Sequence, residues 1–470
     1  MKRNTIKIVY LLIGLVFIAS SCNDDFLDVD SQFEIDQADS GTTVTPEQMI
    51  NGVYGMLTDW DYAFSYLGIT EIISDNADKG SSPTDTGADK DVLDQLTFTS
   101  SAGSIRAMWT KWYKSVGRAT TSIEYSESYG LTDESYKSRL IGEAKFLRAL
   151  NYFWLVRSFG DVPLQHIDIV QRQPKADVYA FIEQDLEDAI ASLPLKNGYA
   201  AADLGRVTKG AAQALLAKVY MYQEKWQQAY DMADDVISST QYDLYSDYAE
   251  LWRASQENGV ESIFEVQARG EATAHGVQQY SQTQGARGTS GWGWGFNTPS
   301  QNLLDAFNAE GDDIRRDATI IFAGETLWDG REVSASVQNP MYNEKAYSSA
   351  NAGSSDGDKN IRILRYAEVL LIKAEAAIHT GDDAATPLNL VRDRVGLDPI
   401  TSPTVQDIWK ERRLELAMEH DRWFDLVRTG QAQAAMAADG KTFVVGKHEL
   451  FPIPNDQLNQ TPEMTQNPGW

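Results

Sequence analysis

Residues that could bind a metal ion are scattered along this chain of 470 residues. The five histidines have neither the HExxH nor the Cys-His spacing of a zinc site, and we expect each to be a surface or core residue: His166, His275, His379, His420 and His448. Asp356, Asp358 and Asn360 resemble the start of a calcium-binding loop. The sixth position of that loop is Ile361 instead of Gly, and the twelfth is Ala367 instead of Glu. We therefore interpret the segment as an exposed turn, and expect no metal and no cofactor.

Patterns that would indicate catalysis are equally weak. Gly291, Gly293 and Gly295 alternate with aromatic residues and lack the strand-then-helix context of a dinucleotide-binding motif. A glycosidase needs two carboxylates about 5 to 9 Å apart, and a sequence with 68 acidic residues does not reveal such a pair. The sequence therefore favours a protein that is not an enzyme, with a glycoside hydrolase as the alternative.

Charge and composition limit the partners and the size of the core. The chain has 41 basic and 68 acidic residues, a formal net charge of -27, so it repels phosphate backbones and we expect no nucleic-acid partner. Hydrophobic residues make up 42% of the chain and aromatic residues 10%, which is enough for a large buried core.

The N-terminus has the pattern of an export signal. Lys2, Arg3 and Lys7 precede an apolar run over 8–19 that is too short to span a bilayer. The only cysteine, Cys22, follows small residues at the place where a bacterial lipoprotein signal is cleaved and its thiol acylated. We expect residues 1–21 to be a lipoprotein signal peptide and Cys22 to carry the lipid. The acidic run that follows Cys22 resembles the tag that sends some lipoproteins to the outer face of the outer membrane.

The clearest structural signal is a helical hairpin over 206–240. Apolar residues recur there at three-to-four spacing on both sides of a short polar corner, and small residues, Ala217 and Ala229, stand where the helices must approach closely. The pattern matches a tetratricopeptide repeat in part, so we expect a degenerate repeat that needs neighbours. The departures from the repeat are Gln213 for Trp, Ala233 for Phe and Gln241 for Pro.

The remaining elements suggest a mainly α scaffold at about 40–240 and 361–430. We expect an irregular, loop-rich subdomain with a few short strands at about 241–360, and an extended, proline-containing tail at 431–470. Trp109 and Trp112 are expected in the core, and the helix over 140–159 should be buried on several sides. Further helices are expected over 46–57, 106–125, 179–193, 361–380, 386–395 and 407–428, a short strand over 262–266, a loop over 60–66 and an exposed loop over 74–89.

Several motifs, in order, resemble one known family. ERRLELAMEHDRWFDLVRTG at 411–430 and LFPIPNDQLNQTPEMTQNPGW at 450–470 are similar to the C-terminal motifs of the SusD/RagB family, outer-membrane nutrient-binding lipoproteins of Bacteroidetes. EAKFLRALNYFWLVRSFGDVPL, LRYAEVLLIKAEA and the opening CNDDFLDVD also fit. The chain departs from the pattern with His420 where Gly is usual, Thr429 where an aromatic residue is frequent, and Trp470 where Tyr is usual.

This resemblance implies that residues 22–470 form one SusD-like domain, with a tetratricopeptide-like scaffold and an irregular ligand-binding subdomain. It further implies a cell-surface lipoprotein, anchored to the outer membrane by lipid, that captures oligosaccharides and delivers them to a SusC-like TonB-dependent transporter without chemistry. A surface glycoside hydrolase and a structural helical-repeat adaptor are the alternatives.

The segment from Gly291 to Asn297 is the predicted ligand-binding region. Tryptophan between glycines does not belong to a packed helix, and alternation could place Trp292, Trp294 and Phe296 on one face of a short strand. This face is either core or an exposed apolar plate for a pyranose ring. By resemblance, such sites combine the inserted subdomain with the early loops. The predicted ligand-binding residues are Trp60, Asp75, Asn76, Asp78, Trp292, Trp294, Asn297 and Tyr342.

Overall fold

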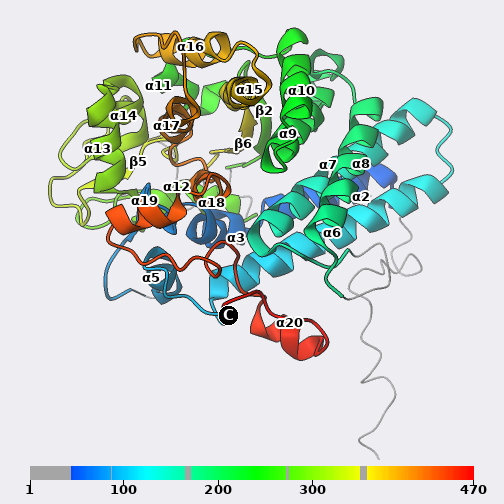
Figure 1. Cartoon of the computed structure of the whole chain (residues 1–470), viewed down its shortest axis with the longest axis horizontal. Helices are drawn as coiled ribbons and strands as arrows, with labels where there is room; N and C mark the ends of the chain where they lie inside the picture. The colour runs from blue at the N-terminus through cyan, green and yellow to red at the C-terminus, as the bar shows by residue number, and fades with distance from the viewer. Residues whose placement is uncertain (1–43, 86, 165–170, 271–274, 350–356) are drawn as a thin grey trace, which may run out of the picture. The chain divides into compact units, whose positions relative to one another are not determined.

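A computed structural model describes residues 44–85, 87–164, 171–270, 275–349 and 357–470. Helices predominate in these ranges, and the strands are few and short (Figure 1). The predicted mainly α fold is confirmed. The predictions for residues 1–21, Cys22, His166 and Asp356 lie outside the described residues.

The scaffold is an array of helices in which neighbours in the chain pack against each other. The helix α6 packs on α7, α7 on α8, α8 on α9 and α9 on α10, while α15 returns from far along the sequence to pack on α10 (Figure 1). Trp112 of α6 and Trp154 of α7 lie in stacked orientation with ring centroids 5.8 Å apart in the main core, and Trp109 is also buried, as predicted. The helices of the array are α2 (Pro46–Leu57), α6 (Gly103–Ser128), α7 (Glu134–Phe159), α8 (Lys175–Ser192), α9 (Lys209–Tyr222), α10 (Trp226–Ser238) and α15 (Tyr366–Thr380).

The predicted hairpin over 206–240 is α9 and α10. Thr208 caps α9 by accepting a hydrogen bond from the backbone N–H of Ala211, and Glu224 takes a left-handed φ of 56° in the corner. Ala217 and Ala229 are fully buried, which allows the two helices to approach closely. The predicted helical hairpin is therefore confirmed, with small buried residues on both of its helices.

The described residues of the irregular part form three antiparallel two-stranded sheets, two of which join segments far apart in sequence. Strand β1 (Ala77–Gly80) pairs with β3 (Phe296–Pro299), β2 (Ser262–Val266) pairs with β6 (Ile361–Arg365), and β4 (Ile320–Phe322) pairs with β5 (Met341–Asn343). Short helices fill the space between the strands: α11 (Tyr248–Leu251), α12 (Tyr280–Gln284), α13 (Gln301–Glu310) and α14 (Asp313–Thr319), with 3-10 turns η5 (Ala254–Gln256) and η6 (Val277–Gln279). The predicted strand over 262–266 is confirmed as β2.

The predicted loop over 60–66 is wrong, because this segment is helical. It forms α3 (Trp60–Ala63) and α4 (Ser65–Leu67), followed by a π-helix, η2 (Gly68–Ile72). Asp59 caps α3 by accepting a hydrogen bond from the N–H of Asp61. Tyr62 and Tyr66 are buried against Trp154, so the aromatic residues stabilise the short helices through tertiary packing.

The predicted exposed loop over 74–89 is also largely wrong. Asp75 and Asn76 are buried, residues 77–80 form β1, and α5 (Ala88–Asp94) begins at the end of the segment. Small and polar residues suggested solvent exposure here. In the structure they pair with a strand more than 200 residues away, which supplies the hydrogen bonds that water would otherwise provide.

Two other helices are shorter than predicted. Residues 361–365 form β6, so α15 begins only at Tyr366. The helix over 407–428 is broken into α17 (Val405–Glu415) and α18 (Arg422–Arg428), with left-handed φ values of 64° at Met418 and 73° at His420 between them. The predicted helix over 386–395 is confirmed as α16 (Ala385–Arg394).

The C-terminal segment is less extended than predicted. It contains two short helices, α19 (Ala432–Ala438) and α20 (Asn455–Gln460), joined by non-helical chain. The second follows directly on Pro454, consistent with proline before the first turn of a helix. The remaining 3-10 turns of the described chain lie between α8 and α9: η3 (Lys196–Gly198) and η4 (Ala201–Asp203).

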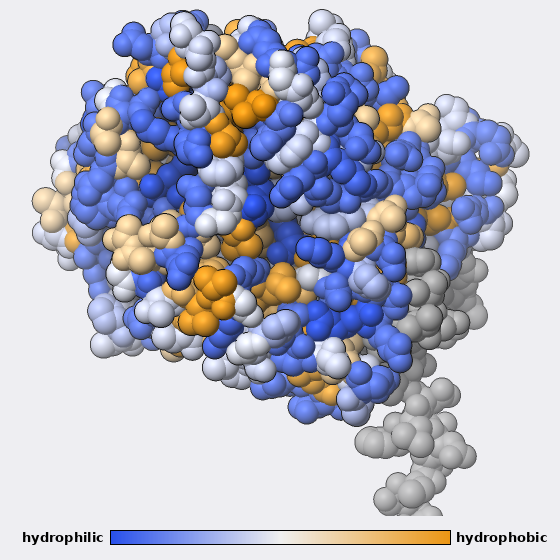
Figure 2. All heavy atoms as spheres, in the orientation of Figure 1, coloured by the Kyte–Doolittle hydropathy of each residue, from blue (hydrophilic) through white to orange (hydrophobic). Residues whose placement is uncertain are grey.

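Hydrophilic residues cover most of the face shown in Figure 2, and hydrophobic residues form separate small groups on it. This surface agrees with the formal net charge of -27. Among the described residues, no helix is both long enough and apolar enough to cross a bilayer.

Candidate functional site

The backbone of residues 291–295 does not form a strand. It is hydrogen-bonded to α12 and to the residues that follow this helix. The N–H of Trp294 donates to the carbonyl of Gln282 over 2.8 Å, and the N–H groups of Trp292 and Gly293 both donate to the carbonyl of Ala286. The strand β3 begins only at Phe296. The prediction that Trp292, Trp294 and Phe296 alternate on one strand is therefore wrong, because these local hydrogen bonds replace strand pairing.

Trp292 is a packing residue in this arrangement. Its indole is half-buried on a small core, with the Tyr347 ring centroid 5.6 Å away in T-shaped orientation. The guanidinium of Arg331 lies 4.6 Å from the centroid of the Trp292 ring and covers one face of it. This environment supports the core interpretation of Trp292.

Trp328 was missed in the sequence and lies on the same cluster. Its indole is 45% exposed, with the Tyr347 ring 6.1 Å away and the Arg253 guanidinium 4.2 Å from the ring centroid. Glu344 holds Arg253 through an ion pair of 3.2 Å. The sequence did contain a signal: Trp328 stands before Asp329 and Gly330, and an Asp-Gly pair marks a tight turn whose tip projects from the fold.

Trp60 forms a second aromatic group with Phe64 and Phe296. Its indole is 37% exposed at the start of α3, 4.6 Å from the Phe64 ring, which is in turn 5.1 Å from Phe296 in T-shaped orientation. Phe296 is two residues from Trp294, whose side chain is partly exposed. The segment 291–296 connects the two ring groups along the chain. We call their residues and Trp294 the aromatic set: Trp60, Phe64, Trp292, Trp294, Phe296, Trp328 and Tyr347.

Asp75 and Asn76 do not belong to this surface. Asp75 is 2% exposed and accepts two hydrogen bonds from the guanidinium of Arg422, at 2.7 and 2.8 Å. Burial alone would raise the pKa of the Asp75 carboxyl, but the charge of Arg422 outweighs it and lowers the pKa to about 2. Asn76 is fully buried and accepts a hydrogen bond from Nε of Arg413. Both predicted ligand residues therefore connect η2 and β1 to the C-terminal motif.

Two other predicted ligand residues are buried as well. The side-chain amide of Asn297 donates to Gln284 of α12 over 2.8 Å, and the Tyr342 hydroxyl accepts a hydrogen bond from the N–H of Asn339 over 2.9 Å. Among the eight predicted ligand residues, those with exposed or partly exposed side chains are Trp60, Asp78, Trp292 and Trp294.

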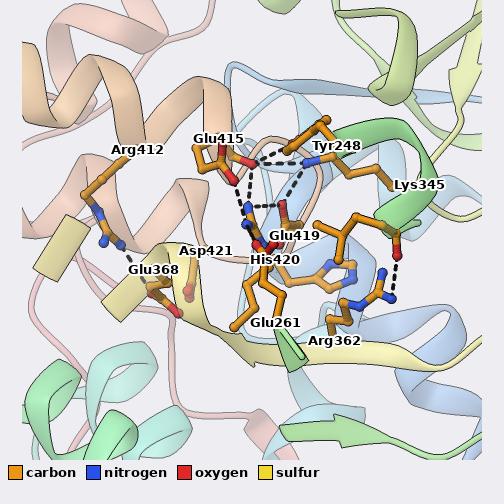
Figure 3. Close-up of polar contacts among 12 residues, drawn as sticks. Tyr248, Glu261, Lys345, Arg362, Glu368, Arg412, Glu415, Glu419, His420 and Asp421 are labelled. Atoms are coloured by element: carbon orange, nitrogen blue, oxygen red, sulfur yellow. Dashed lines mark hydrogen bonds and ion pairs between the residues drawn. The ribbon is translucent and has the colours of Figure 1, made fainter. Parts of the chain in front are cut away.

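A buried network of ion pairs lies between the irregular segments and the scaffold (Figure 3). Arg365 of β6 contacts Glu261 at 2.8 Å, Glu415 at 2.6 Å and Glu419 at 2.6 Å, and Lys345 contacts Glu419 at 2.7 Å. The carboxylates are thus paired with cations, which suits a structural role. In the described ranges, no group of three or more His, Cys, Asp or Glu side chains is arranged to hold a metal ion.

Comparison with known families covers nearly the whole chain. The profile of the SusD family matches residues 260–470, and a second profile, described as "Starch-binding associating with outer membrane", matches residues 25–221. The chain belongs to the SusD family.

Individual SusD-family relatives match over most of their length. The chain is 29% identical to SusD-like protein P2 of Formosa agariphila across 100% of both chains, and 26% identical to Starch-binding protein SusD of Bacteroides thetaiotaomicron across 80% of this chain and 81% of that protein.

Solved structures of the SusD family share this fold. A laminarin binding SusD-like protein superposes with a TM-score of 0.76 at 29% identity, covering 90% of this chain and 99% of the other. Surface glycan-binding protein A from Bacteroides fluxus gives a TM-score of 0.80 at 26% identity, covering 91% and 100%.

The C-terminal motif that this chain shares with the SusD family is structural. Glu415 and Glu419 belong to the buried network, and Arg422 pairs with Asp75 across the interior. The motif therefore holds the irregular segments on the helical array and carries no information about a ligand.

Proposed function

We propose that this SusD-family protein binds an oligosaccharide on three indoles of the aromatic set: the exposed Trp60 and Trp328, and the partly exposed Trp294. The observation that carries the proposal is the exposure of Trp60 (37%) and Trp328 (45%), whereas tryptophans such as Trp112 are buried. An indole offers a flat apolar plate to the CH face of a pyranose, while polar groups around it take the hydroxyls.

The relatives support this proposal and suggest the first ligands to test. The names of similar proteins refer to laminarin, starch and surface glycans. Laminarin oligosaccharides and malto-oligosaccharides are therefore the first probes.

We further propose that the protein acts at the cell surface. Acylated at Cys22, the protein sits at the outer face of the outer membrane and delivers the glycan to a SusC-like TonB-dependent transporter, without cleaving it. Support comes from the lipoprotein-like N-terminus and from the family description, which refers to association with the outer membrane. Co-purification of such a transporter in mild detergent is the expected result, and a lone monodisperse protein from native membranes would contradict it.

Isothermal titration calorimetry of the mature protein with both oligosaccharide series tests binding. Replacing Trp60, Trp294 or Trp328 by Ala should weaken binding by on the order of 1 to 3 kcal/mol, about 5- to 150-fold in Kd. Tyr129→Ala is the matched control, because this tyrosine is 37% exposed at the end of α6, outside the aromatic set. Unchanged affinity in all three tryptophan variants would place the site elsewhere.

The same incubations separate binding from hydrolysis. We expect the oligosaccharides to be recovered intact by chromatography after prolonged incubation. Turnover that disappears when a single Asp or Glu is replaced would favour the glycoside hydrolase alternative.

A further inference from the structure

His420 occupies an unusual place at the break between α17 and α18, beside the buried ion network (Figure 3). Its φ of 73° lies in the left-handed region, where a side chain is strained and glycine is favoured. The residue is 2% exposed, so the imidazole is enclosed by protein. The contacts of the ring must therefore offset the backbone strain.

The imidazole of His420 contacts both η2 and α12, and so connects these two elements. Its Nε2 is 2.9 Å from the hydroxyl of Tyr280, the first residue of α12, and its Nδ1 is 3.5 Å from the hydroxyl of Thr70 in η2. The ring of Tyr66 lies 5.1 Å away.

The hydrogen-bond pattern defines the tautomer. The hydroxyl of Thr70 donates its proton to the carbonyl of Tyr66 over 2.7 Å. The Thr70 oxygen can therefore only accept a hydrogen bond from Nδ1 of His420. The proton of a neutral imidazole then lies on Nδ1, and Nε2 accepts from the hydroxyl of Tyr280. Burial lowers the pKa of His420 to about 4, which keeps the ring in this neutral form at physiological pH.

The helix α12 in turn holds the segment of the aromatic set that contains Trp294 and Phe296. The carbonyl of Gln282 accepts from the N–H of Trp294, and the side-chain oxygen of Gln284 accepts from Asn297 and Asn343, each over 2.8 Å. These contacts fix the start of β3 and the segment that carries the tryptophans. A displacement of α12 would move them together.

We propose that His420 is a positioning residue that fixes α12, and through it Trp294 and the aromatic set, to the scaffold through the hydroxyl of Tyr280. Positioning matters for ligand binding only if the proposed function holds. The contact itself can be tested without any glycan.

Hydrogen–deuterium exchange of the full mature protein tests the proposal. Tyr280→Phe removes only the hydroxyl, and His420→Gly removes the ring while relaxing the backbone. Both should accelerate exchange in the peptide covering residues 286–297 by about fivefold or more, with the α9–α10 hairpin unchanged. The double variant should exchange no faster than His420→Gly, because both changes break the same contact.

Tyr242→Phe is the matched control, since it removes a comparable buried contact of 2.7 Å between the Tyr242 hydroxyl and Thr208, away from α12. It should leave residues 286–297 at the wild-type rate. Unchanged exchange there in Tyr280→Phe, additive effects in the double variant, or acceleration spread equally over the hairpin would overturn the proposal. Because no glycan is used, failure here is distinguishable from failure of the proposed function, which calorimetry of the wild-type protein reports.

Discussion

At the scale of single residues, the surroundings of each indole separate packing from ligand contact. Trp292 lies under Arg331 and against Tyr347, whereas Trp328 rests on Arg253 with 45% of its surface exposed. Both rings have a guanidinium over one face, so the difference lies in exposure: Trp328 leaves surface free for a sugar, whereas Trp292 is half-buried in a small core. The two tryptophans should therefore respond differently to the same substitution.

Trp292→Ala is expected to destabilise the fold by about 1 to 3 kcal/mol, because it removes packing from a small core. Trp328→Ala should change stability by less than about 0.5 kcal/mol, since it truncates a largely exposed side chain. Thermal and denaturant unfolding of both variants measure this difference. Equal melting temperatures for the two would mean that Trp292 does not act as a packing residue.

Asp75 gives a second prediction at this scale. Asp75→Ala leaves the buried Arg422 and the partly buried Arg413 without their carboxylate partner, and should destabilise the protein by about 3 to 5 kcal/mol. Asp393→Ala is the control, because Asp393 is exposed on α16, and its effect should stay within about 0.5 kcal/mol. Denaturant unfolding at neutral pH compares the two, and a stable Asp75→Ala protein would argue against a structural role.

The same carboxylate predicts a pH dependence. The pKa of Asp75 is lowered from 3.8 to about 2 in the folded protein, so the unfolded chain takes up the proton first as the pH falls. The stabilisation, about 2 kcal/mol, is fully present above pH 4 and is lost as the pH falls from about 4 to about 2. The difference in unfolding free energy between the wild type and Asp75→Asn should shrink over this window. A constant difference would contradict the assignment.

At the scale of elements, the α9–α10 hairpin depends on small residues where its helices meet. Ala229→Leu adds volume at a fully buried position and should cost about 1 to 3 kcal/mol of stability through overpacking. Gln228→Leu, one residue earlier on the exposed side of α10, is the matched control and should be nearly neutral. Thermal unfolding measures both, and equal melting temperatures would mean that the helices do not need this close approach.

Helices with a regular spacing of apolar residues could be predicted from the sequence. Strands that depend on pairing with a distant segment could not. The helices α2, α7, α8, α9 and α10 follow from apolar spacing within each segment. The strand β6 was interpreted as helix because its sequence continues the apolar pattern of α15, yet it pairs with β2 about 100 residues earlier. Pairing between distant segments produces no regular spacing of residue types in either segment, so the sequence does not reveal it.

At the scale of the whole molecule, the N-terminus gives the prediction that links the fold to a membrane. Cys22→Ser should move the protein from the membrane fraction to the soluble fraction and abolish labelling by palmitate, because the acyl chain is its proposed anchor. A neighbouring serine substitution, Ser21→Ala, should leave both unchanged if cleavage still occurs before Cys22. Membrane association and labelling that persist in Cys22→Ser would refute the lipoprotein assignment.

The mainly α fold, the family motifs and the glycine-spaced tryptophans of the candidate site follow from the sequence alone. These features depend on residue types at short, regular spacing, which the chain displays directly. The motif residues needed no structure to be recognised, but their role did, since Arg422 pairs with an aspartate 347 residues away.

Contacts between distant segments set which of the predicted ligand residues face solvent. Asp75, Asn76, Asn297 and Tyr342 have the polar groups of a sugar site, yet their partners on other segments bury them. Trp328 is a candidate because the fold leaves its side chain exposed, while Trp292 is half-buried against a small core that includes Tyr347. Exposure depends on which distant segments pack over a side chain, and these contacts form only when the chain folds.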